Sequence, residues 1–125
     1  KSSFNKYGLK AGFDAVMDLR SSNPEFTALF LMGDQAAIGS LHALHQLGLS
    51  VPDQVSLLTC DDAPEIQYLD PPLTVMDIPN RKFGYTAAQR VHHMITNDST
   101  QAPSAQESWM RGELIIRAST APPRK

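Results

Sequence analysis

Residues 51–79, VPDQVSLLTCDDAPEIQYLDPPLTVMDIP, decide the fold of this chain of 125 residues. The run at residues 55–58 (VSLL) is short and almost continuously apolar, which is typical of a strand covered on both faces in a parallel sheet. Two adjacent carboxylates, Asp61 and Asp62, lie just past the carboxyl end of that strand. Ligands of open α/β sheets bind at this edge, so the stretch predicts both a strand and a binding site.

The rest of the chain alternates between helical and strand patterns. Apolar residues at helical spacing predict helices over residues 7–19, 36–47 and 81–95. Apolar runs between turn signals predict further strands over residues 26–32, 73–76 and 113–117. We expect Asp34 to cap the second helix and Gly48 to end it. This order predicts an α/β fold, with a mostly parallel sheet and helices on both faces.

Composition excludes several classes of protein. A formal net charge of −2 and a pI near 6.0 leave no basic surface with which this chain could hold nucleic acid. The single cysteine, Cys60, cannot form an internal disulfide, and no apolar run approaches the ~20 residues that span a bilayer. We therefore expect a cytoplasmic protein that does not associate with membranes.

The sequence indicates neither a metal site nor a cofactor. His42 and His45 lie three residues apart on a predicted helix, without a carboxylate or cysteine at ligand spacing nearby. His92 and His93 lie on adjacent faces of another predicted helix, so they cannot both face one ion.

Catalysis by the two aspartates is also not expected. Adjacent residues at a strand end point in different directions, whereas paired-carboxylate hydrolysis needs two groups facing each other across ~5 to 9 Å. No Ser-His-Asp pattern and no glycine-rich phosphate loop accompanies Asp61 and Asp62. The sequence therefore predicts that the protein is not an enzyme.

Residues 51–79 resemble the segment VPxDVSVVGFDDxPxAxxLxPPLTTVxQP in the effector-binding core of the LacI/GalR family of transcription regulators. The spacing of the aspartate pair and of residues 71–74 (PPLT) is kept without a gap. The chain departs from the segment at Thr59, Cys60 and Ile78, where the family usually has Gly, an aromatic residue and Gln.

Two further stretches carry the same resemblance. Residues 32–52, MGDQAAIGSLHALHQLGLSVP, are similar to the family's Asn-Asp followed by MALGALRALRELGLRVP, with Gly33 in the place of Asn. The end of the chain, ELIIRAST at residues 113–120, resembles the terminal PxLIxRxST of the family.

The resemblance implies a periplasmic-binding-protein-like type I fold that is incomplete. Residues 1–79 would form the C-terminal effector-binding subdomain. Residues 80–108 would form a crossover helix and loop that pack on an absent N-terminal subdomain. Residues 109–120 would return as the final strand, and residues 121–125 would form a disordered tail.

The implied function is the effector-binding and dimerisation part of a transcriptional repressor of this family. Its effector would be a small polar metabolite, a sugar or nucleoside, and a helix-turn-helix domain absent from this sequence would bind DNA. The alternative is a periplasmic sugar-binding protein of an ABC transporter, which has the same fold.

Two sets of positions follow from the resemblance. The effector-binding set is Tyr7, Gly33, Asp34, Asp61 and Asp62. The homodimer set is Ile38, Leu41, His45 and Leu69. Burial inside one monomer is the alternative for Ile38 and Leu41, and packing of a helix-start aromatic on the core is the alternative for Tyr7.

Overall fold

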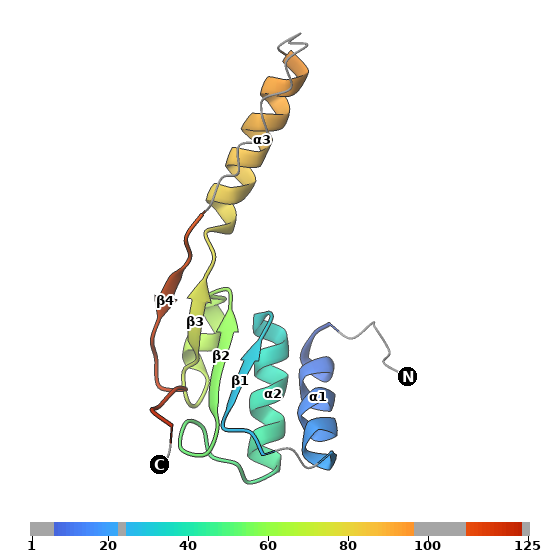
Figure 1. The fold of residues 1–125 in the computed structure, drawn as a ribbon, viewed down its shortest axis with the longest axis vertical. Coiled ribbons are helices and arrows are strands. Elements are labelled where there is room, and N and C mark those ends of the chain that lie inside the picture. The colour runs from blue at the N-terminus through green and yellow to red at the C-terminus, as the bar shows by residue number, and fades with distance from the viewer. Residues whose placement is uncertain (1–6, 23–24, 97–109, 124–125) are drawn as a thin grey trace. The chain divides into compact units, whose positions relative to one another are not determined.

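The computed structural model describes residues 7–22, 25–96 and 110–123, and the chain separates into two compact units. The first unit combines Lys1–Asp77 with Glu113–Lys125, and the second is Ile78–Gly112. The predicted α/β alternation is confirmed (Figure 1). The elements are α1 (Leu9–Ser21), β1 (Ala28–Leu31), α2 (Asp34–Gln46), β2 (Ser56–Cys60), the 3₁₀ helix η1 (Pro64–Tyr68), β3 (Thr74–Asp77), α3 (Asn80–Thr96) and β4 (Glu113–Ile115).

The sheet of the first unit has four strands in the order β1-β2-β3-β4. The first three strands are parallel, and β4 pairs with β3 in the antiparallel direction. The mostly parallel sheet expected from the sequence is therefore confirmed. Because α2 connects two adjacent parallel strands, β1 and β2 end at the same edge of the sheet.

One face of this sheet carries the hydrophobic core. Successive strand residues point to opposite faces, so Leu57 and its neighbour Leu58 lie on different sides. Leu57 is fully buried and packs in one cluster with residues of the three helices described in this unit. That cluster includes Val16 of α1, Leu44 of α2, Ile66 of η1 and Val75 of β3.

The opposite face of the sheet is apolar and is exposed at the outer strands β1 and β4. We expected helices on both faces, but the helices described in this unit all contribute to the one core cluster. Strand alternation and register place Phe30, Leu114 and Ile116 on the other side, and all three are exposed.

The helices α1 and α2 cross closely near their N-termini. The side-chain hydroxyl of Ser40 is buried and donates a hydrogen bond to the Gly12 carbonyl at 3.2 Å. A Cβ atom at Gly12 would collide with the carbonyl oxygen of Ala36, so a larger residue would force the helices apart. Both helices begin at the end of the sheet where β1 and β2 end (Figure 1).

The helix η1 was not predicted, because the sequence patterns indicate no helix or strand between residues 58 and 73. Pro64 occupies its first turn, where a missing N–H group costs nothing and a fixed φ favours the helical conformation. Ile66 then enters the core with no exposed surface, and its carbonyl accepts a hydrogen bond from the Leu73 amide at 3.2 Å. A buried side chain therefore anchors this short segment.

The residues after β4 bind back to the sheet. The buried Ser119 hydroxyl donates to the Leu57 carbonyl at 2.6 Å and accepts from the Thr74 amide at 2.8 Å. The backbone of Ala121, where the tail was expected to begin, binds the Ser56 side chain: its amide donates to the Ser56 hydroxyl at 3.1 Å, and its carbonyl accepts from that hydroxyl at 3.3 Å. Residues 124 and 125 lie outside the described part of the chain.

The second unit is built on α3, which has no buried residue. Its apolar residues Phe83, Val91 and Ile95 recur at helical spacing and are exposed. The expected packing of residues 80–108 on another subdomain stays a prediction, and residues 97–108 are not described. Among the described helices of both units, none is long and apolar enough to cross a membrane.

Candidate functional site

Four of the five predicted effector-binding residues lie at one edge of the sheet. Gly33 and Asp34 follow β1, and Asp61 and Asp62 follow β2. The two strands are parallel neighbours with Leu31 beside Thr59, so both pairs are brought to the carboxyl edge together. This is the edge at which open α/β sheets bind ligands.

Backbone geometry accounts for the glycine at position 33. Gly33 has φ 112° and ψ 146°, a conformation that residues with a Cβ atom rarely adopt. Gly33 is also the N-cap of α2, and Asp34 is the first residue of the helix, with no side-chain cap hydrogen bond. The prediction that Asp34 caps the helix is therefore wrong, because the helix begins earlier than the apolar periodicity indicated. In the first turn, the Asp34 carboxylate still interacts favourably with the helix dipole.

Asp61 has a strained backbone. Its φ of 67° lies in the left-handed region, where Asn and Asp are tolerated better than other side chains. Its amide donates a hydrogen bond to the Met76 carbonyl of β3 at 3.1 Å, which holds this conformation in place. Strained residues that neighbouring structure holds in place occur frequently in binding sites.

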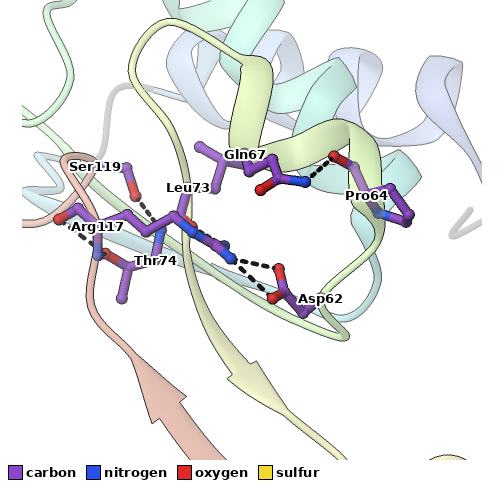
Figure 2. Close-up of polar contacts among 7 residues, drawn as sticks. All are labelled: Asp62, Pro64, Gln67, Leu73, Thr74, Arg117 and Ser119. Carbon is purple, nitrogen blue, oxygen red and sulfur yellow. Dashed lines mark hydrogen bonds and ion pairs between the residues drawn. The ribbon is translucent and has the colours of Figure 1, made fainter.

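Asp62 is paired with Arg117 (Figure 2). The Nη2 atom of Arg117 donates to both Asp62 carboxylate oxygens, at 2.7 and 2.8 Å, and Nη1 donates to the Leu73 carbonyl at 2.8 Å. The pair thus connects the end of β2 to the segment after β4. Since a carboxylate has about four lone-pair sites, Asp62 keeps capacity to accept further hydrogen bonds. Its role in effector binding stays a prediction.

Tyr7, the fifth predicted effector residue, lies two residues before α1. This helix begins at the same end of the sheet as the binding edge (Figure 1). The Tyr7 side chain is 96% exposed, so it does not pack on the core of the described chain. Stacking of this ring on an effector stays a prediction.

Cys60 immediately precedes Asp61 and is buried, with 6% of its surface exposed. Burial raises the pKa of the Cys60 thiol, and the neighbouring Asp61 carboxylate raises it further. The Cys60 Sγ atom contacts the Met32 Sδ atom at 3.9 Å. Sequence reasoning excluded an internal disulfide for this cysteine and noted it as a departure from the family segment, but did not predict its burial.

The four residues predicted for the dimer line one groove of about 580 Å³ between α1, α2 and the loop after η1. The four are Ile38, Leu41, His45 and Leu69. Leu41 is 4% exposed and belongs to the core, so burial inside the monomer accounts for it, while Ile38 is half-buried. Sequence reasoning missed the contribution of α1, which adds Leu9 and Phe13 to the groove.

His42 lies in the same groove and contacts Phe13 and Gln46. Its ring stacks at an angle on that of Phe13, with centroids 5.6 Å apart, and its Nε2 atom lies 3.4 Å from the Gln46 amide nitrogen. Within the described ranges no three His, Cys, Asp or Glu side chains are grouped so that they could hold a metal ion.

Comparisons with known proteins place this geometry in a family. The model of the periplasmic binding protein-like domain matches residues 3–120. The chain is 32% identical over 114 residues to the probable HTH-type transcriptional repressor ExuR of Bacillus subtilis, which covers 91% of this chain. It is 39% identical over 95 residues to the HTH-type transcriptional regulator MalR of Streptomyces coelicolor, covering 76% of this chain.

A solved structure agrees with these sequence matches. A sugar-binding transcriptional regulator of the LacI family from Escherichia coli, complexed with phosphate, is 31% identical, with a TM-score of 0.78. The match covers 94% of this chain and 41% of that one. The chain spans 33% of the length of ExuR and 27% of MalR, about a third of the curated relatives or less.

Proposed function

Because the chain belongs to the family of periplasmic binding protein-like domains, we propose that it is the effector-binding and dimerisation part of a LacI/GalR-type transcription regulator. The names of two relatives support this proposal, since both are HTH-type regulators. The solved regulator at 31% identity is described as sugar-binding, which supports a sugar or a similar small polar metabolite as the effector.

The convergence of Gly33, Asp34 and Asp61 at one sheet edge is the observation on which the proposal rests. A carboxylate at such an edge accepts hydrogen bonds from two neighbouring hydroxyl groups, which is the pattern that a sugar ring offers. An aromatic ring such as that of Tyr7 would stack on the apolar face of the same sugar. Asp61 is the residue that we expect to contribute most to this recognition.

The effector would regulate DNA binding by binding one conformation of the protein more tightly than another. A ligand shifts a conformational equilibrium only as far as it prefers one state over the other. We propose that effector favours one of two hinge-related arrangements of two subdomains and so changes the spacing of DNA-binding heads in a homodimer. The groove beside Ile38, His45 and Leu69 would be part of the surface that joins the two copies.

A sugar-binding protein of a transporter is the alternative with the same fold, and fold alone does not distinguish the two. The two named relatives at 32% and 39% identity favour the regulator. A regulator would act in the cytoplasm. We also propose that the chain is not catalytic, because the Asp62 carboxylate is bound to Arg117, whereas paired-carboxylate hydrolysis needs two carboxyl groups that face each other.

The proposal is tested with the intact protein that contains this chain. A panel of monosaccharides and nucleosides is titrated calorimetrically, and the DNA upstream of its own gene is tested by mobility shift with and without each ligand. We expect one ligand to bind and to change the affinity for DNA. Binding of a sugar without any binding to DNA would support the transport alternative, and binding of no ligand in either class would contradict the proposed effector.

A further inference from the structure

Three sulfur-containing side chains lie in one row across the sheet, just before the binding edge. Leu31 of β1 is beside Thr59 of β2, so the next residues, Met32 and Cys60, are also neighbours, and their sulfur atoms are 3.9 Å apart. On the other side of Cys60, the register partner on β3 is Met76. Register partners leave a sheet on the same face, so all three side chains share one face.

We propose that Met32, Cys60 and Met76 form a binding site for a soft monovalent metal ion, Cu(I). Thiolate and thioether ligands select Cu(I), whereas ions such as Mg²⁺ and Ca²⁺ prefer oxygen ligands. The site is not a group of His, Cys, Asp and Glu side chains, because two of its three ligands are methionines.

The distance between the Met32 and Cys60 sulfur atoms is suitable for binding one ion between them. Two sulfur atoms that each lie about 2.3 Å from one metal ion, at the angle of a trigonal site, are about 4.0 Å apart. The Met32 and Cys60 sulfur atoms lie at 3.9 Å, so an ion could be bound between them with little change of the backbone. Unbranched methionine side chains adapt easily, which allows Met76 to supply the third sulfur.

Burial and charge also favour a monovalent ion. Cys60 is 6% exposed, and an uncompensated charge at such a position would be costly. One thiolate and one Cu(I) ion cancel each other, and thioethers add no charge, so the loaded site is neutral. The thiol proton is released to solvent when the ion binds. Met32 is 74% exposed, which gives the ion a route from solvent to the buried sulfur.

The competing explanation is that the three residues only pack together, since a buried free cysteine behaves as a small apolar side chain. The intact protein that contains this chain is titrated under anaerobic conditions against the coloured Cu(I) complex of bicinchoninate, and the loss of colour reports transfer of Cu(I). The variants are Met32→Leu, Met76→Leu and Cys60→Ser. Met94→Leu is the matched control, because Met94 is an exposed methionine on α3.

We expect one equivalent of Cu(I) per chain, at least tenfold weaker binding in Met32→Leu and in Met76→Leu, loss of binding in Cys60→Ser, and no change in Met94→Leu. X-ray absorption of the loaded wild-type chain should show sulfur ligands only, which tests the site even if a variant fails to fold. Absence of transfer, or binding that both Met→Leu variants keep in full, would overturn the proposal.

Discussion

Arg117, in the segment after β4, donates hydrogen bonds from one guanidinium nitrogen to both carboxylate oxygens of Asp62, which follows β2. The two side chains are only 18% and 26% exposed, so this ion pair is partly removed from water. The same guanidinium binds the Leu73 carbonyl, and the Arg117 amide binds the Thr74 hydroxyl (Figure 2). One arginine therefore connects the last segment of the chain to two strand ends.

Replacing this arginine should destabilise the fold. Hydrogen bonds to charged groups contribute more than neutral ones, so we expect Arg117→Ala to lower the free energy of unfolding by about 1.5 to 3 kcal/mol. Urea denaturation measures the change. The matched control is Lys10→Ala, which removes the exposed pair with Asp14 on α1 and should cost less than about 0.5 kcal/mol. Equal effects of the two substitutions would contradict a structural role for Arg117.

Substitutions at two residues of the groove should affect different properties, dimerisation for Ile38 and folding stability for Leu41. If Ile38 lies in the homodimer surface, Ile38→Glu should give monomers in analytical ultracentrifugation of the intact protein, with an unchanged circular dichroism spectrum. Leu41→Ala should instead lower the free energy of unfolding by about 2 to 5 kcal/mol, because Leu41 is 4% exposed in the core. Ala15→Glu, at an exposed position of α1, is the control and should change neither property. Unfolding of Ile38→Glu would favour a core role for Ile38.

Much of the fold could be predicted because its elements depend on local patterns. The strand at residues 55–58 is apolar in sequence and is found as β2, and the helical periodicity of residues 36–47 is found as α2. The 3₁₀ helix η1 was missed because five residues are too few for a periodicity, and because the burial of Ile66 depends on tertiary contacts.

The candidate site was predictable only in part, for a related reason. The position of Asp61 after a buried strand is local information, and strand ends meet at one edge by topology. The partner of Asp62 lies 55 residues away, and no local pattern indicates which cation will bind it. The left-handed backbone of Asp61 also could not be predicted from the local sequence, because the Met76 carbonyl on another strand holds it.

The rate at which Cys60 is alkylated in the folded chain should keep rising to a higher pH than the rate of an ordinary cysteine. Burial and the Asp61 carboxylate raise the thiol pKa above its ordinary value of 9.0, so the folded chain has less thiolate at a given pH than the unfolded chain. We expect alkylation by iodoacetamide at pH 7 to be slower in the folded state than in urea. The rate in the folded state should keep rising as the pH passes 9.0. A rate that levels off below pH 8 would contradict the raised pKa.

Asp61 should contribute to effector binding and not to stability. Asn is the suitable replacement, because it tolerates the left-handed φ of 67° and nearly keeps the size of the side chain while removing its charge. We expect Asp61→Asn in the intact protein to weaken effector binding by about 1.5 to 3 kcal/mol, the contribution of hydrogen bonds to a charged group. The midpoint of urea denaturation without ligand should hardly change. Asp53→Asn, at an exposed carboxylate in the turn before β2, is the control and should leave the affinity unchanged. Calorimetric titration measures both variants, and an affinity unaltered by Asp61→Asn would show that this carboxylate does not bind the effector.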